Sequence, residues 1–243
     1  MRKLRRIFRI RFDHETTANL NVTDGLLALG YFIYYLVFIY GFGLWMFKTS
    51  IVEDLSIYFS SNYLFLSILY LPISLLSLAP IFIILRIRRQ PLASVGLTCK
   101  RILLNICIGV VAALPFTWSE IYRLIVQGSS LPFEGYEALF EFLYLLVCIG
   151  LTEEVSFRGF IQTRMLGLIR NKYIAVAVVS IMFAFMHVPF QMIKADMSFV
   201  EFIRYDSIHL LITAGMHVYF VYLYTKFNGI VAPTVTHGLV NFM

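Results

Sequence analysis

Residues 26–47 read LLALGYFIYYLVFIYGFGLWMF and contain no charged side chain. An α-helix rises 1.5 Å per residue, so about 20 apolar residues cross the hydrocarbon core of a bilayer, which is roughly 30 Å thick. This stretch therefore predicts a membrane-spanning helix.

The same apolar character recurs along the rest of the chain. Six further candidate spans are 63–85, 102–125, 140–157 with a helical continuation to residue 170, 173–188, 207–224 and the shorter 230–243. Pro72, Pro80 and Pro115 lie within these segments and should kink them, which a helix bundle tolerates. The sequence thus predicts an all-α fold, a polytopic transmembrane bundle of about seven spanning helices.

The composition supports lipid as the solvent. Hydrophobic residues make up 60% of the 243 residues and charged residues only 14%, whereas a soluble domain is about half apolar and about a quarter charged. Cys99, Cys107 and Cys148 show no CxxC spacing and no even pairing, so neither a disulfide framework nor a thiolate zinc site is expected.

The positive charge is distributed as a topology signal. Of the 20 Lys and Arg residues, 16 fall in segments 1–24, 86–101, 158–172 and 226–229. This asymmetry predicts a cytoplasmic N-terminus, and with seven spans Met243 would lie on the far side. The net charge of +6 is explained by the orientation of the chain in the membrane and by contact with anionic lipid. No nucleic-acid partner is therefore expected.

We expect three regions. Residues 1–24 form a basic cytoplasmic segment, kept rather than cleaved as a signal peptide because a polar stretch separates its charges from the first long apolar run. Residues 25–139 form the N-terminal transmembrane helices. Residues 140–243 form a bundle that contains the chemically interesting residues.

The first polar cluster is Glu153-Glu154-Val155-Ser156-Phe157-Arg158. Ionisable groups inside apolar helices are costly and are functional candidates by default. Glu154 and Arg158 are spaced i, i+4 with the acid first, the better order for a helical ion pair. Arg158 can then neutralise Glu154 and leave Glu153 as an unpaired carboxylate, suited to act as a general base on water. The alternative is a helix end whose charges reach the interface.

The second cluster ends at His187, in Phe183-Ala184-Phe185-Met186-His187. A lone His on an apolar face is usually a structural group. If the chain turns near Asn171, however, Glu153 lies 18 residues before the turn and His187 16 residues after it, about 27 and 24 Å along paired antiparallel helices. The two side chains would then lie at nearly the same depth and could share a water.

The third cluster is His237-Gly238-Leu239-Val240-Asn241. His237 and Asn241, at i and i+4, share one helix face, and both can donate hydrogen bonds to a developing oxyanion. The alternative is a structural role, in which the two side chains form hydrogen bonds between membrane helices. Asn228, Gly229 and Pro233 predict a turn and a helix start before this cluster.

Together the motifs Glu153-Glu154-x-x-x-Arg158, Phe183-x-x-x-His187 and His237-x-x-x-Asn241 resemble, in order and spacing, those of the CAAX-protease and bacteriocin-processing (CPBP, or Abi) intramembrane proteases. The resemblance covers roughly residues 140–243. It implies that Glu153 and His187 activate water, that His237 and Asn241 hold the oxyanion, and that Glu154 and Arg158 support them.

Metal dependence is the open alternative within this resemblance. Zinc takes His and carboxylate ligands and leaves a position for water in catalytic sites, so Glu153, His187 and His237 could ligate it. Asn is a poor zinc ligand and the HExxH spacing is absent. We therefore favour a mechanism without a cofactor, with zinc as the alternative.

The resemblance implies an intramembrane endopeptidase in a bacterial cell membrane, embedded in lipid. Its substrates would be small or membrane-associated peptide precursors, such as a bacteriocin or pheromone leader, or a CAAX-type tail of a membrane protein. One alternative is a non-catalytic scaffold or bacteriocin immunity protein with the same fold. Another is a transporter, which we disfavour because the sequence shows no inverted repeat. The sequence does not indicate an oligomeric state.

Overall fold

The computed structural model describes residues 9–128 and 135–243, and within these residues the fold is helical with no strand. Five helices in this part of the chain are long and apolar enough to cross a membrane. They are α3 (Val22–Lys48), α5 (Asn62–Ile87), α6 (Ile102–Ile125), α9 (Lys172–Lys194) and α11 (Ser207–Phe227). The predicted all-α membrane bundle is thereby confirmed, and the chain is an integral membrane protein.

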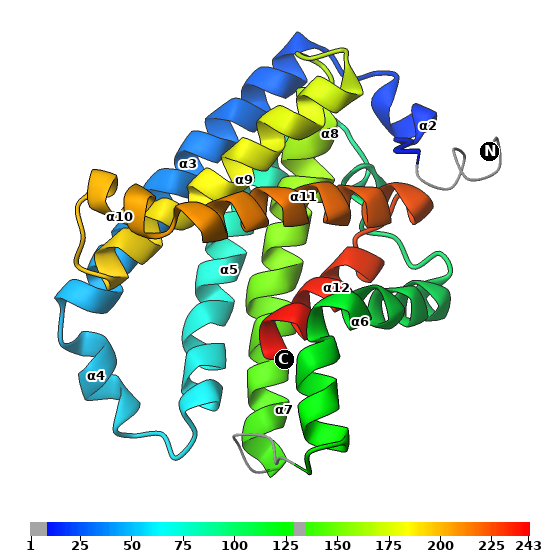
Figure 1. Ribbon diagram of the computed structural model, residues 1–243. Helices are drawn as coiled ribbons and strands as arrows, with labels where there is room; N and C mark the ends of the chain where they lie inside the picture. Colours follow the sequence, from blue (N-terminus) through cyan, green and yellow to red (C-terminus); the bar gives the residue numbers. More distant parts are fainter. Residues whose placement is uncertain (1–8, 129–134) are drawn as a thin grey trace.

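Two of the seven expected spans have a different form. One is a continuous helical run through the middle of the bundle (Figure 1), made of α7 (Gly135–Leu143), the π-helical segments η2 (Tyr144–Leu151) and η3 (Glu154–Ile161), and α8 (Gln162–Met165). We call this run, residues 135–165, the central helix. The other is α12 (Val231–Phe242), whose 12 residues extend only about 18 Å. The count of seven full spans is therefore not confirmed.

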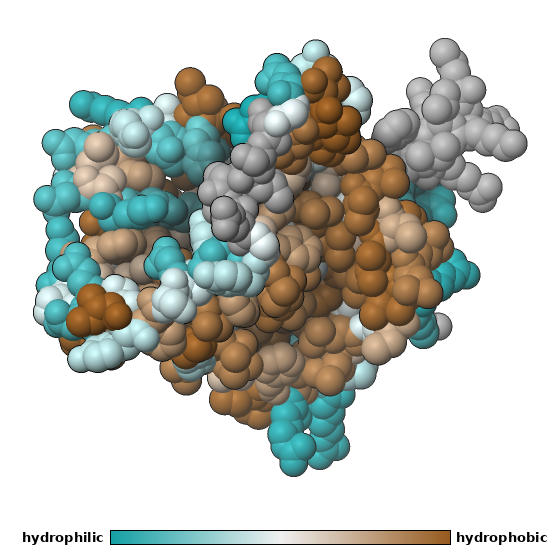
Figure 2. All heavy atoms as spheres, turned by 90° about the horizontal axis from the view of Figure 1, so that it is seen from below, coloured by the Kyte–Doolittle hydropathy of each residue, from teal (hydrophilic) through white to brown (hydrophobic). Residues whose placement is uncertain are grey.

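Short elements complete the described chain. They are α2 (His14–Thr17), α4 (Ile51–Ser56), η1 (Leu92–Val95) and α10 (Phe199–Tyr205). The first eight residues of the expected basic segment lie outside the described part of the chain. On the face seen in Figure 2, hydrophobic residues cover a broad area and hydrophilic residues gather mainly along one side, as expected for a surface that meets lipid.

Local sequence signals set the ends of the spans. The Asn21 side chain accepts hydrogen bonds from the backbone at the start of α3, and Asp24 completes a capping box that satisfies otherwise orphaned N–H groups. The Asn171 side chain accepts hydrogen bonds from the first backbone N–H groups of α9, so the chain turns at this residue, as the comparison of depths assumed. Asn228 ends α11 in the left-handed region with φ 47°, a conformation that Asn tolerates better than most residues.

Helix α6 bends sharply near its middle (Figure 1), where Pro115 lies inside it. Proline lacks the N–H for the helical ladder and crowds the preceding turn. Two side chains bond carbonyl groups beside the bend: the hydroxyl of Tyr219 donates to Ala112 O (2.8 Å), and that of Thr117 to Ala113 O (3.2 Å). The expected kink at Pro115 is thus present and is hydrogen-bonded by its surroundings.

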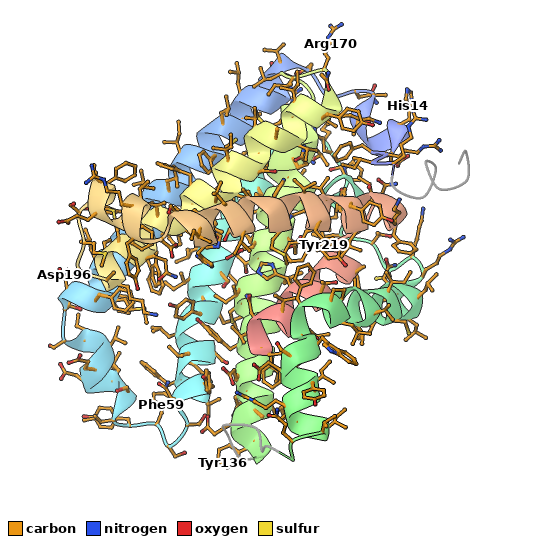
Figure 3. The ribbon with its side chains drawn as sticks, viewed as in Figure 1. His14, Phe59, Tyr136, Arg170, Asp196 and Tyr219 are labelled. Atoms are coloured by element: carbon orange, nitrogen blue, oxygen red, sulfur yellow. The ribbon has the colours of Figure 1, made fainter. Side chains whose placement is uncertain are left out.

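Hydrogen bonds join the loops at one end of the bundle. Lys172 Nζ donates to Ile10 O (2.8 Å), Asp13 N donates to Asn228 Oδ1 (3.0 Å), and Ile230 N donates to Gly96 O (3.1 Å). We call this region, residues 9–24, 86–101, 164–172 and 226–230, the basic end. Figure 3 shows His14 and Arg170 there, with Phe59, Tyr136 and Asp196 at the other end of the molecule.

The central helix is fixed in depth by its contacts at the basic end. Arg164 is buried and donates through Nη1 to Ser94 O (2.8 Å) and through Nη2 to Gln90 Oε1 (2.7 Å). Close by, Gly159 lies so near Val95 that an added Cβ would be 2.4 Å from its carbonyl oxygen. Because the central helix carries Glu153 and Glu154, these contacts also determine where the two carboxylates lie.

We expect Gly159→Ala to lower the stability of the protein in detergent by about 1–3 kcal/mol, because the methyl group overpacks a backbone contact. The measurement is thermal unfolding of the purified variants. Gly215→Ala on α11 is the matched control, since nothing lies within 4 Å of its added Cβ, and it should be neutral or stabilising by up to about 1 kcal/mol. Equal midpoints for the two variants would contradict the close contact.

Candidate active site

Glu153 and Glu154 lie where the central helix changes its winding. The π-helical segment η2 ends at Leu151 and η3 begins at Glu154, so Glu153 lies between them. Single π-helical turns are rare and occur often at functional sites. Successive side chains of a helix point about 100° apart, so the two neighbouring carboxylates face different surroundings.

Glu154 faces the protein interior and has two partners. Its Oε1 lies 3.0 Å from Arg158 Nη1 and 2.9 Å from His237 Nδ1, and both the Glu154 and Arg158 side chains are 0% exposed. The ion pair expected from the i, i+4 spacing is therefore present. Its link to His237, 83 residues away, joins the first motif to the third.

Two aromatic rings enclose the guanidinium group of Arg158. Its Cζ lies 4.0 Å from the ring centroid of Phe183 and 4.7 Å from that of Phe220. A cation over a ring face is attracted by the ring quadrupole, more strongly when it is desolvated. Phe183 belongs to the second motif, so Arg158 contacts that motif directly and contacts the third through Glu154.

Glu153 faces a cavity of about 940 Å³. Its side chain is 12% exposed, its Oε2 lies 3.7 Å from His237 Nε2, and this oxygen accepts no hydrogen bond from the described residues. A distance of 3.7 Å is too long for a hydrogen bond. Glu153 therefore has one buried oxygen without a hydrogen-bond partner among the described residues, next to the His237 ring, and the residue itself lines the cavity.

The four residues predicted to carry out the chemistry line this one cavity: Glu153, His187, His237 and Asn241. The supporting residues Glu154 and Arg158 do not line it and are packed behind it. The structure thus separates a group of residues that can contact a substrate from a buried pair that holds them. Their catalytic roles remain a prediction.

Hydrogen bonds orient the two histidine rings. His187 Nδ1 lies 2.9 Å from Phe183 O, and because a carbonyl only accepts, this nitrogen carries a proton. In a neutral His187 the lone pair is then on Nε2. His237 Nδ1 donates to Glu154, which leaves its Nε2 on the side of Glu153. Its ring also stacks on Phe220, with centroids 5.0 Å apart and planes at 18°.

Asn241 lies in the last turn of α12. The following residue, Phe242, packs edge-on against Phe142 of the central helix with centroids 5.6 Å apart. Met243 N also donates to Leu239 O at 3.1 Å. These contacts hold the final turn of α12 against the central helix and keep Asn241 at the cavity.

The residues present do not form a metal site as they stand. Within residues 9–128 and 135–243, no group of three or more His, Cys, Asp or Glu side chains is arranged to hold a metal ion. In the alternative ligand set, Glu153, His187 and His237, one nitrogen of each ring is already bonded to protein. Metal-ligating histidines commonly bond protein through their second ring nitrogen in this same way, so these bonds do not argue against zinc, which stays the alternative.

Some residues that shape the site belong to none of the three sequence motifs. Phe220, on α11, covers both Arg158 and His237, yet a Phe in an apolar helix looks like any packing residue. The Tyr31 hydroxyl bonds Ser156 Oγ at 2.8 Å and ties α3 to the central helix. His217 on α11 is fully buried and bonds Gln162 Oε1 at 3.0 Å. It is therefore a core residue.

Residues 135–243 match the family model described as "Rce1-like: Type II CAAX prenyl endopeptidase Rce1-like". This part of the chain is therefore similar to the CAAX protease family, a family of membrane-embedded proteases, and the resemblance inferred from the three motifs is confirmed. No curated protein and no solved structure matches the chain.

We expect Glu154→Ala to destabilise the protein by about 3–5 kcal/mol, because it leaves the buried Arg158 without a counter-charge. The double variant Glu154→Met with Arg158→Met should recover most of that loss, since a buried pair can often be replaced by apolar groups of similar volume. Thermal unfolding in detergent measures both changes.

The exposed pair Glu120–Arg123, at 2.8 Å on α6, supplies the control. Glu120→Ala should change stability by less than about 1 kcal/mol, because water screens exposed ion pairs. If Glu154→Ala were no more disruptive than Glu120→Ala, the buried pair would not have the structural role assigned to it.

Proposed function

We propose that the protein is an intramembrane endopeptidase in which Glu153, assisted by His187, activates a water molecule for attack on a peptide bond. One observation carries the proposal: residues from three separate motifs line a single cavity, while the ion pair beside them is packed outside it. The match to the Rce1-like family model supports the same reaction class.

The two acceptors suit a water molecule with two hydrogens. The Glu153 side chain lines the cavity and is 12% exposed, so its carboxylate offers one acceptor, and a neutral His187 offers the lone pair of Nε2. In the proposed mechanism the water donates to both, so that an oxygen lone pair can face the substrate carbonyl. Glu153 takes one proton as the O–C bond forms, a general-base step worth about 10²–10⁴-fold in rate.

The carbonyl oxygen gains negative charge as the tetrahedral intermediate forms. The amide N–H of Asn241 can donate to it, and so can Nε2 of His237 when that nitrogen is protonated. The carboxylates of Glu153 and Glu154 on either side then balance the charge of the imidazolium. Collapse of the intermediate breaks the C–N bond, and the proton held by Glu153 passes to the leaving amine.

The substrate must bring its peptide bond into a membrane-embedded cavity. We propose small or membrane-associated peptides, with a bacteriocin or pheromone leader ahead of a prenylated CAAX-type tail. The aromatic rings of Tyr35, Phe42 and Tyr144 line the same cavity as Glu153 and suit apolar side chains next to the cut bond. The activity is proposed to need no metal, with zinc as the alternative tested below.

Glu153→Ala is expected to reduce hydrolysis by about 10²–10⁴-fold, through loss of the general base. The assay is mass spectrometry of products from a library of leader-type and farnesylated CAAX peptides, with purified protein in detergent. Glu137→Ala, on the same helix but not at the cavity, is the control and should retain activity. Wild-type turnover by Glu153→Ala would overturn the mechanism.

A chelator added to the same assay tests the zinc alternative. Under the proposal, hydrolysis by the wild-type protein persists when chelator is present. Loss of activity with chelator and its return with zinc would instead assign Glu153, His187 and His237 as metal ligands.

Asn241→Asp is expected to lower kcat by about 10²–10³-fold, because it replaces the N–H donors with acceptors of the same shape. KM should change little if the interaction forms mainly in the transition state. Steady-state kinetics on the best library peptide separates the two constants. A raised KM with unchanged kcat would make Asn241 a residue that only binds the ground state.

A further inference from the structure

We infer that the cavity opens on the extracytoplasmic side of the membrane, so that this protein cuts peptide segments presented at the outer face. The inference rests on the proposed function for its chemistry, and on the geometry of the cavity and the distribution of charge for its direction.

The residues that line the cavity come from one half of the bundle. In the helices that connect the two ends, they lie between Tyr35 and Phe47 on α3, between Asn62 and Ser77 on α5, and between Phe183 and Lys194 on α9. Among the described residues, none of the basic end, as defined above, contributes to the lining. The cavity therefore has no opening through the basic end.

The position of His187 on α9 agrees with this direction. His187 lies 15 residues after Lys172, the first residue of α9, and 7 residues before Lys194, the last. These separations correspond to roughly 22 and 10 Å. Along α9, His187 is thus nearer to the end at which α9 meets α10 than to the basic end.

The rim at that near end is polar. Glu53 on α4, Asn62 at the start of α5 and Lys194 at the end of α9 all line the cavity. Both charged side chains belong to exposed residues, and a charged side chain on the outer surface of a membrane protein is favourable only where water reaches it. This rim is the place where water, and a peptide with polar groups, can enter.

The basic residues show which end faces the cytoplasm. The described Lys and Arg residues of the basic end are Arg9, Arg11, Arg86, Arg88, Arg89, Lys100, Arg101, Arg164, Arg170, Lys172 and Lys226, whereas Lys48, Arg123, Lys194 and Arg204 lie toward the opposite end. Cytoplasmic loops carry the excess of positive charge in membrane proteins. The basic end is then cytoplasmic, and the cavity rim faces outward.

This direction narrows the class of substrate. A prenylated tail that stays in the cytoplasm would meet the closed, basic end of the protein. A leader or tail segment of a peptide that has been exported, or that is anchored in the outer leaflet, would meet the rim directly. The inferred substrate is such an extracytoplasmic peptide segment, and the class of reaction that supplies it is peptide export.

Cysteine labelling tests the direction without any substrate. The natural Cys99 is exposed and lies at the basic end, while Cys107 and Cys148 can be replaced by Ala. One variant keeps Cys99 alone; two others replace all three natural cysteines with Ala and carry Glu53→Cys or Lys194→Cys. Each is treated with a membrane-impermeant maleimide in right-side-out vesicles, before and after permeabilisation with detergent.

We expect Glu53→Cys and Lys194→Cys to be fully labelled in sealed vesicles, and Cys99 only after permeabilisation. Labelling of Cys99 in sealed vesicles, or protection of the two rim positions until permeabilisation, would overturn the inference. Labelling reports sidedness whether or not the protein hydrolyses anything, so an inactive protein would refute the proposed function alone. Glu153-dependent hydrolysis with an inward-facing rim would refute only this inference.

Discussion

The structure depends on one buried charge, the guanidinium group of Arg158, which is 0% exposed within a membrane protein. A charge at such a position is costly unless it is paired and its surroundings favour it. Glu154 supplies the counter-charge, and the ring faces of Phe183 and Phe220 supply the rest of the enclosure. Each of these residues belongs to a different helix from the next: the central helix, α9 and α11. The contacts that stabilise the buried charge of Arg158 therefore also determine how these three helices pack.

The site follows from this arrangement. Glu154 uses the same oxygen for Arg158 and for His237, so the orientation of the His237 ring on α12 depends on an ion pair in the central helix. Helix α12 is too short to be held by lipid alone. It packs closely on α6, where a Cβ at Gly109 would lie 2.8 Å from Ala232 O and 2.7 Å from Val235 Cβ. The small residue on α6 and the acceptor on the central helix together place His237 and Asn241 at the cavity.

The sequence allowed part of this to be predicted. Long apolar runs predicted the spans, and the i, i+4 spacing predicted the Glu154–Arg158 pair. Similar distances from Asn171 predicted that Glu153 and His187 lie at nearly the same depth. What it did not reveal depends on contacts between distant residues. Nothing local marks Phe220 as a cover for Arg158, or Glu154 as the partner of His237. The two π-helical segments were also missed, because hydropathy measures compatibility with lipid and not the winding of a helix.

The neighbouring carboxylates show why the first motif needs two glutamates. Adjacent positions on a helix point in different directions, so one side chain can face the packed interior while the next faces the cavity. In this protein the inner residue, Glu154, already contacts Arg158 and His237 through one oxygen. Protonation of this carboxylate would weaken both contacts. The outer residue, Glu153, has an oxygen with no hydrogen-bond partner among the described residues. Because holding the site and exchanging protons require opposite properties of a carboxylate, a single glutamate at this place could not serve both purposes.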